Sequence, residues 1–453
     1  MEFETLFQSQ KDFFRTHRTK DVAFRKETLK KLKAVLKDNE NRLYDAIYKD
    51  FRKGKFDTFL TELNLIYNEI DFFLKNLDKL SKPKKVKTPL KLQPGSGHIY
   101  HDPLGVTLVI GAWNYPYQLT LVPMISSIAA GNTCFVKPSE LPENTMHLLA
   151  ELINDNFSSK HIFVAEGGIP ETTELLKLPY DKIFFTGSPK VGKIVYEAAA
   201  KNLVPVVLEL GGKSPAIVTR TADLEVAAKR LVWGKFLNGG QTCIAPDYLL
   251  VEESVKSKLL QLIKEKLDEI NYSDGSEHYT AIINKRNFDR VTSLIDRHKI
   301  FYGGQQNEET LYIQPTILDN ISWDDAVMQE EIFGPVFPVI GFNNYDEILQ
   351  KIIEGEKPLA AYLFTKNEKE KNKLLDLVSF GGGCINDTLM HITSDYLPFG
   401  GIGNSGIGNY HGEYGFLAFS HQKSVIEKST WGEPDWKYPP YTDKKMQWLK
   451  KVL

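Results

Sequence analysis

The sequence has few cysteines and lacks the cysteine and histidine patterns that bind metals. Its three cysteines lie far apart, at positions 134, 243 and 384, and its ten histidines form no HExxH motif. An odd number of widely spaced cysteines does not suggest a disulfide framework or a zinc knuckle, and it is typical of a reducing compartment. We therefore expect free thiols and no metal site.

Long hydrophobic runs are also missing. The first residues, MEFETLFQSQKDFF, are charged from the second position and lack the apolar stretch of a signal peptide. No segment reaches the roughly 18–20 apolar residues that a membrane span requires. These absences predict a cytoplasmic protein.

Neither sign of charge is in excess. The chain has 56 Lys and Arg against 58 Asp and Glu, a formal net charge of −2. This balance offers no broad positive surface for nucleic acid. Five lysines do gather with three prolines in residues 82–97, KPKKVKTPLKLQPGSG. We interpret this segment as a solvated connector or a subunit-contact strand rather than a nucleic-acid patch, and we expect no nucleic-acid partner.

What the sequence does contain is a regular alternation of strands and helices. A length of 453 residues predicts two or three domains. Residues 1–80 show helical periodicity, whereas from Gly105 onwards apolar, β-branched runs alternate with helical segments, including one from Pro189 to Ala200. A second alternation begins near Gly211, with expected helices at 223–236 and 254–268. Continuous apolar strands between helices predict doubly wound parallel sheets, an α/β fold, with ligands bound beyond the carboxyl ends of the strands.

A near match to a phosphate-binding loop lies at residues 187–194, GSPKVGKI, between a strand and a helix. Ile194 occupies the position at which a P-loop needs a hydroxyl for Mg²⁺, and Pro189 removes a backbone amide. We therefore exclude a nucleoside triphosphatase. A Gly-Ser turn that leads into a helix remains suited to a dinucleotide pyrophosphate, although many such turns are only tight connections.

Cys243 has the surroundings of a reactive thiol. It follows Asn, two glycines, Gln and Thr in FLNGGQTCIAPDY, a small-residue loop in which a thiol can be accessible. Cys134 lies within an apolar strand and is interpreted as buried, whereas Cys384 is ambiguous. Spacing alone leaves a structural role for Cys243 equally open.

Two polar residues in other segments could support that thiol, one in a strand and one in a loop. Glu209 stands in the apolar strand VVLEL, where burial should raise its pKa and make it a candidate general base. The alternative is a strand-end carboxylate held by the amides of Gly211 and Gly212. Asn114, in the loop GAWNYP, could donate to an oxyanion, or it could be an ordinary turn residue. No His-Asp pattern accompanies Cys243, so a cysteine protease is not favoured.

Taken together, these segments resemble the aldehyde dehydrogenase superfamily, most closely its class 3 branch of fatty or aromatic aldehyde dehydrogenases. The resemblance covers about residues 5–425, and the short N-terminus and the QTCIAPDY sequence favour class 3. It rests on seven motifs in a fixed order: GAWNYP (111–116), VKPSE (136–140), FTGS (185–188), LELGGKSP (208–215), NGGQTCIAPDY (238–248), QEEIFGP (329–335) and LPFGGIGNSG (397–406).

The resemblance implies a role for each matching position. Cys243 matches the nucleophile, Glu209 the base that activates the deacylating water, and Asn114 the oxyanion donor. The expected contacts to the cofactor, NAD with NADP tolerated, are Trp113, Lys137, Glu140, Gly187, Ser188, Val191, Leu210, Gly211, Glu331 and Phe333. The family binds this cofactor without a GxGxxG motif, which is consistent with the absence of one here. The implied reaction forms a thiohemiacetal, then a thioester, and then the acid.

The resemblance also implies a division of the chain and a homodimer. Residues 1–80 and 100–208 would form the cofactor-binding domain, and residues 209–395 the catalytic domain. Residues 81–99 and 396–428 would form a bridging element at the subunit contact. The remaining residues, 429–453, would form a tail. Trp448, Leu449, Val452 and Leu453 beside lysines could touch a membrane surface, but we expect the tail to pack on the protein.

The substrate is less well determined than the chemistry. Tyr115, Trp233 and Ile244 are expected at the mouth of the site, which favours medium- or long-chain aliphatic or aromatic aldehydes. A succinic-type semialdehyde dehydrogenase is the alternative. A CoA-acylating enzyme is disfavoured by Glu209, and a non-catalytic scaffold of the same fold is disfavoured by the presence of all three catalytic candidates.

Overall fold

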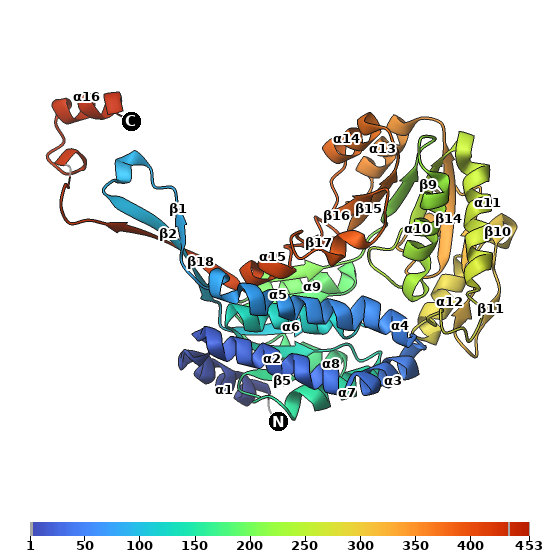
Figure 1. The fold of residues 1–453 in the computed structure, drawn as a ribbon, viewed down its shortest axis with the longest axis horizontal. Coiled ribbons are helices and arrows are strands. Elements are labelled where there is room, and N and C mark those ends of the chain that lie inside the picture. The colour runs from blue at the N-terminus through green and yellow to red at the C-terminus, as the bar shows by residue number, and fades with distance from the viewer. Residues whose placement is uncertain (1–2, 434, 453) are drawn as a thin grey trace.

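A computed structural model describes residues 3–433 and 435–452 of the chain. Two mostly parallel sheets form its two main bodies, each with one antiparallel edge strand, and a narrow three-stranded sheet projects from one of them (Figure 1). The α/β class and the doubly wound parallel sheets predicted from the sequence are confirmed.

The first body is built around a six-stranded sheet with the order β17-β7-β6-β3-β4-β5. Its strands are β3 (Val106–Ile110), β4 (Thr133–Lys137), β5 (Ile162–Val164), β6 (Lys182–Thr186), β7 (Val206–Glu209) and β17 (Gly406–Ile407). All are parallel except β17, which pairs antiparallel with β7. Neighbouring residues of β3 point to opposite faces: Leu108 packs with α1 (Phe3–Arg15), α8 (Ile169–Leu175) and α9 (Pro189–Ala200), and Val109 packs with the helices on the other face.

Helices cover both faces of this sheet, as burial of both faces requires. The helices of this body are α1 (Phe3–Arg15), α2 (Val22–Asp38), α3 (Glu40–Phe51), α4 (Lys55–Thr58), the π-helix η2 (Phe59–Leu63), α5 (Asn64–Leu80), α6 (Gln118–Ala130), α7 (Glu143–Asn154), α8 (Ile169–Leu175), α9 (Pro189–Ala200) and α15 (Gly412–Ala418). The helical prediction for residues 1–80 is confirmed, and α9 has the predicted bounds. Gly131 ends α6 because its φ of 98° suits glycine.

The second body holds a seven-stranded sheet with the order β10-β13-β14-β9-β8-β15-β16. Its strands are β8 (Pro215–Val218), β9 (Tyr248–Glu252), β10 (Ile300–Tyr302), β13 (Thr316–Leu318), β14 (Val336–Phe342), β15 (Ala360–Phe364) and β16 (Gly382–Ile385). The surrounding helices are α10 (Leu224–Phe236), α11 (Glu253–Ile270), α12 (Lys285–Ser293), α13 (Tyr345–Glu354) and α14 (Glu368–Leu377), beside a small hairpin of β11 (Gln306–Asn307) and β12 (Tyr312–Ile313). The side chain of Asp223 caps α10, so this helix begins where the sequence predicted.

The projecting sheet consists of β1 (Lys84–Val86), β2 (Gly95–Pro103) and β18 (Ser420–Lys428), all antiparallel. The expected bridging range of 396–428 is wider than this sheet, because β17 pairs with β7 and α15 packs on α5 and α6. The division of the chain into functional domains stays a prediction.

The tail forms α16 (Asp443–Val452), which lies beyond the end of the projecting sheet (Figure 1). Most of its side chains are exposed, and Trp448 contacts Trp436 with ring centroids 6.0 Å apart. The tail was expected to pack on the rest of the protein, and this expectation is wrong for α16. The helix has only the narrow projecting sheet beside it, which offers little surface to pack against. Leu453 lies outside the described residues. Among the residues described, no helix has the length and apolar character needed to cross a membrane.

Candidate active site

A cavity of about 1040 Å³ opens at the carboxyl ends of the strands of the six-stranded sheet and reaches the second body. This is the place at which parallel sheets bind ligands. Every catalytic and cofactor candidate lines it: Trp113, Asn114, Lys137, Glu140, Gly187, Ser188, Val191, Glu209, Leu210, Gly211, Cys243, Glu331 and Phe333. Residues up to 220 positions apart in the sequence are therefore brought to one site.

Cys243 is held at the cavity by a tightly folded loop. The preceding Asn238, Gly239 and Gly240 have φ values of 57°, 62° and 72°, and a Cβ on Gly240 would lie 2.3 Å from the carbonyl oxygen of Gly334. Only glycine fits there, so the small residues before the cysteine set the path of the loop. Cys243 is half-buried, and burial, followed by the carboxyl groups of Glu331 and Glu209, raises its pKa to about 12.

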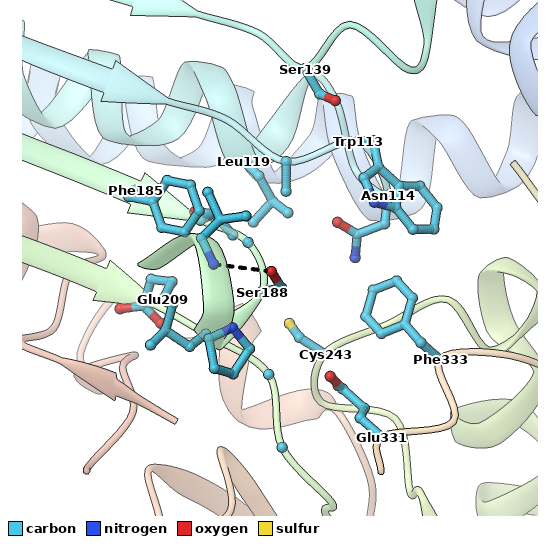
Figure 2. Close-up of a pocket in the computed structure, with 18 of the residues that line it drawn as sticks. Trp113, Asn114, Leu119, Ser139, Phe185, Ser188, Glu209, Cys243, Glu331 and Phe333 are labelled. Carbon is cyan, nitrogen blue, oxygen red and sulfur yellow. Dashed lines mark hydrogen bonds between the residues drawn. The ribbon is translucent and has the colours of Figure 1, made fainter. Parts of the chain in front are cut away.

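Asn114 is fixed against the same loop. Its Nδ2 donates to the carbonyl oxygen of Gln241 at 3.0 Å, and its own carbonyl accepts from Asn238 Nδ2 at 2.9 Å. Because an amide nitrogen carries two hydrogens, one remains for the cavity. In Figure 2 the amide of Asn114 and the sulfur of Cys243 face the same space. This arrangement suits donation to an oxyanion. It favours that role for Asn114 over the alternative of an ordinary turn residue.

Glu209 ends β7 and is 3% exposed. Neither of its carboxyl oxygens has a hydrogen-bond partner among the described residues, so the alternative of a carboxylate held by the Gly211 and Gly212 amides is wrong. Burial raises its pKa well above the usual value, as expected for a general base. In Figure 2 the carboxyl group is turned away from the sulfur of Cys243.

Glu331 and Phe333 enter the cavity from a loop that is tied down by its backbone. The guanidinium of Arg290 donates to the carbonyl oxygens of Glu331 and Ile332, at 3.2 and 2.7 Å. Phe333 has a φ of 48°, and its ring lies edge-on to Trp113 with centroids 5.3 Å apart. Burial, followed by the charge of Asp247, raises the pKa of Glu331 to about 8.

The outer part of the cavity combines a helix N-terminus with charged side chains. The hydroxyl of Ser188 accepts from Val191 N at 3.4 Å and caps α9 (Figure 2), and a Cβ on Gly187 would lie 2.6 Å from the Phe185 ring. The ammonium of Lys137 is buried, which lowers its pKa, whereas Glu140 is exposed at the rim. Anions are favoured at such a helix start.

The predicted mouth residues do not line the cavity. Tyr115 and Ile244 are buried, and Trp233 packs against the core. The prediction failed because an aromatic or apolar residue type does not indicate whether the side chain faces the core or the cavity. The aromatic and apolar side chains that line the cavity instead include Leu119, Phe399 and Tyr410. Phe399 belongs to the LPFGGIGNSG motif, so its presence there was detectable from the sequence.

A family model, "Aldehyde dehydrogenase family", matches residues 1–425. The chain belongs to this family. The match confirms the resemblance drawn from the seven motifs and the predicted activity, an NAD(P)-dependent oxidation of aldehydes to carboxylic acids.

Curated aldehyde dehydrogenases cover nearly the whole chain. The 4,4'-diaponeurosporen-aldehyde dehydrogenase of Staphylococcus aureus is 47% identical over 97% of each chain. Aldehyde dehydrogenase family 3 member A2 of Mus musculus is 45% identical, over 97% of this chain and 92% of its own. The dimeric NADP-preferring aldehyde dehydrogenase of the same species is 44% identical, over 95% and 96%. Family 3 members are thus among the relatives, as expected.

Solved aldehyde dehydrogenase structures share the fold. The substrate-bound state of Staphylococcus aureus AldH matches with a TM-score of 0.97 and 46% identity, over 99% of both chains. An NAD-dependent aldehyde dehydrogenase from Sinorhizobium meliloti matches with a TM-score of 0.86 and 26% identity, over 96% of this chain and 88% of its own.

Proposed function

We propose that this aldehyde dehydrogenase works through a covalent bond to Cys243, with Asn114 as oxyanion donor and Glu209 as general base. The observation that carries the proposal is the meeting of all three in one cavity, with the Asn114 amide and the Cys243 sulfur facing the same space. A nucleophile, a base and a donor for the oxyanion are the three groups that acyl chemistry needs.

The chemistry assigns a separate task to each side chain. The Cys243 sulfur, once deprotonated, adds to the aldehyde carbon, and the negative charge that develops on the oxygen is met by the free N–H of Asn114. After oxidation the acyl group is a thioester on Cys243. A turn of the Glu209 side chain toward the sulfur lets its carboxylate take a proton from water, whose oxygen then displaces the sulfur and releases the acid.

The outer cavity fits a nicotinamide dinucleotide. The α9 N-terminus would hold the pyrophosphate, Lys137 and Glu140 the adenosine ribose, and Glu331 with Phe333 the nicotinamide end. Exposed apolar side chains on the lining, such as Ile169 at 77% exposure, could cover the flat adenine. When bound, the nicotinamide accepts the hydride. Glu140 would repel a 2′-phosphate, which supports NAD as the preferred cofactor, and the NADP-preferring relative supports tolerance of NADP.

We further propose medium- or long-chain aliphatic or aromatic aldehydes as substrates. Leu119 and Phe399 line the same cavity as Cys243 and give it apolar surface. The guanidinium of Arg290, which also lines the cavity, donates to two backbone carbonyls and lies 3.6 Å from Glu330 Oε1, so its charge already has a carboxylate partner within the protein and is poorly placed to select an acidic semialdehyde. The relative named for 4,4'-diaponeurosporen-aldehyde makes that compound a useful member of a test panel.

The test compares Cys243→Ser with Cys384→Ser, a matched change at another half-buried thiol. Initial rates would be measured with hexanal, benzaldehyde and succinic semialdehyde, with NAD or NADP, and without CoA. Cys243→Ser should abolish turnover, whereas Cys384→Ser should retain it. Full activity of Cys243→Ser would remove the assignment, and a preference for succinic semialdehyde would favour the alternative substrate class.

A homodimer is the proposed assembly. β18 is an edge strand of the projecting sheet, and its residues Val425 and Ile426 are exposed. Unpaired, partly apolar edges of this kind are usually covered. The NADP-preferring relative of Mus musculus carries the word dimeric in its name. Light scattering coupled to gel filtration would show a mass near twice 51.5 kDa; a monomer at micromolar concentration would refute the proposal.

A further inference from the structure

A buried ion pair lies behind the loop that carries Asn114. Lys53 follows α3, and Glu62 belongs to the π-helix η2; both side chains are 0% exposed, and Lys53 Nζ lies 2.8 Å from Glu62 Oε1. A buried pair is weak evidence for stability, because the loss of hydration largely offsets the attraction. Its presence therefore calls for another explanation.

The second oxygen of Glu62 binds the start of α6. Glu62 Oε2 accepts the backbone N–H groups of Tyr117 at 2.7 Å and Gln118 at 3.2 Å. A carboxylate at this position satisfies N–H groups that the helix leaves unpaired and favours its dipole. Since α6 begins directly after the loop 111–116, Glu62 fixes the end of the segment that presents Asn114.

Lys53 extends the same arrangement to the loop of Cys243. Its ammonium lies 4.1 Å from the centroid of the Tyr115 ring, within the range of a cation–π contact. The Tyr115 hydroxyl is 2.5 Å from Oγ1 of Thr242, the residue before Cys243. Together with the bond from Asn114 to Gln241, this joins the two loops at two points.

We propose that Glu62 and Lys53 are positioning residues for the reaction, which hold the Asn114 amide at the place where the oxyanion forms beside Cys243. The inference rests on the proposed function. Neither side chain is among the described residues that line the cavity, so both act through the loop. Such an effect can be large, since a misplacement of about 1 Å can cost on the order of 100-fold in rate.

The test is a double-mutant cycle of Glu62→Gln with Asn114→Ala. The Gln variant keeps the size of the side chain and removes its charge. In single-turnover measurements with saturating NAD, Glu62→Gln alone should lower the rate by about 10- to 100-fold, whereas in the Asn114→Ala protein it should lower it by less than about threefold. The dissociation constant for NAD should not change. Equal losses in both backgrounds would overturn the inference, because a merely structural role does not depend on Asn114.

Asp50→Asn is the matched control. Asp50 accepts the backbone N–H groups of Asn144 at 3.0 Å and Thr145 at 2.9 Å at the start of α7, so it binds a helix start as Glu62 does. This variant should lose stability and keep its single-turnover rate. A loss of rate equal to that of Glu62→Gln would show that any such change is harmful, and would overturn the inference.

A second variant covers the case in which Glu62→Gln does not fold. Tyr115→Phe keeps the ring over Lys53 and removes only the hydroxyl contact to Thr242. It should lower the rate by about three- to tenfold, and again by much less when Asn114 is Ala. Additive losses would overturn the inference and leave the proposed function intact, provided that Asn114→Ala alone costs about 100- to 1000-fold. Full activity of Asn114→Ala would instead overturn both.

Discussion

The role of Glu209 as the general base leads to a specific prediction for Glu209→Gln. A general base contributes about 10²- to 10⁴-fold, so steady-state kcat should fall by that factor. The oxidation step does not need this base, and the first turnover should therefore remain. Stopped-flow absorbance at 340 nm should show a burst near one equivalent of reduced cofactor per Cys243, followed by a slow phase.

The stalled species should be a thioester on Cys243. Mass spectrometry of the intact protein should show the added acyl group, and hydroxylamine should restore turnover because this strong nucleophile needs no base to attack the thioester. Unchanged kcat would refute the role of Glu209. A loss of the burst together with kcat would show that Glu209 acts in an earlier step.

The same variant tests the effect of burial on Glu209. Burial raises the pKa of Glu209 above the ordinary 4.5, so the folded protein favours the neutral carboxyl. That contribution to stability is complete below pH 4.5 and is lost as the pH rises toward the folded pKa, at about 1.4 kcal/mol per pH unit. Urea unfolding should therefore find Glu209→Gln similar to wild type at pH 5 and more stable at pH 8. A smaller advantage at pH 8 than at pH 5 would contradict this reasoning.

Two further predictions concern the loops around the thiol. Burial raises the pKa of Glu331 to about 8, so its carboxyl group is charged at pH 9.5 and opposes ionisation of the Cys243 thiol. Glu331→Gln should therefore speed the alkylation of Cys243 by iodoacetamide about three- to tenfold at pH 9.5 and leave its rate unchanged at pH 6.5. A larger effect at pH 6.5 than at pH 9.5 would exclude this coupling. The buried side chain of Gln241 donates to the carbonyl oxygens of Asn238 and Ala281 and accepts from Ile283 N. Gln241→Ala should therefore lower the free energy of unfolding by about 2–4 kcal/mol in urea titrations. A change below about 0.5 kcal/mol would mean that water replaces these bonds.

Much of the fold follows from local sequence signals. The Gly-Ser turn with Pro189 sets the start of α9, and Asp223 sets the start of α10. The apolar runs identify the buried parallel strands, and the small residues before Cys243 identify a tight loop. The common location of all thirteen candidates, however, is predicted only by the family resemblance. Composition and spacing alone allow purely structural roles for Cys243, Glu209 and Asn114.

Other features depend on contacts that no local pattern reveals. Glu62 lies in an ordinary amphipathic segment, and its burial follows only from its bonds to backbone groups 55 and 56 positions later. Tyr115 and Ile244 were misplaced because the cavity side of an element depends on how the loops 111–116 and 238–243 meet. Gly406 and Ile407 were assigned to a bridging element, although they complete a sheet whose other strands end before residue 210.

The antiparallel pair of β17 and β7 makes the reactive centre dependent on late steps of chain synthesis. Gly406 lies opposite Glu209 in this pair, and Leu210 donates its N–H to the carbonyl oxygen of Ser405 at 3.0 Å. A ribosome must therefore add nearly 200 more residues after Glu209 before its strand gains a second neighbour. A chain cut just before residue 405 would keep every catalytic side chain and leave the segment that carries the base at an open sheet edge.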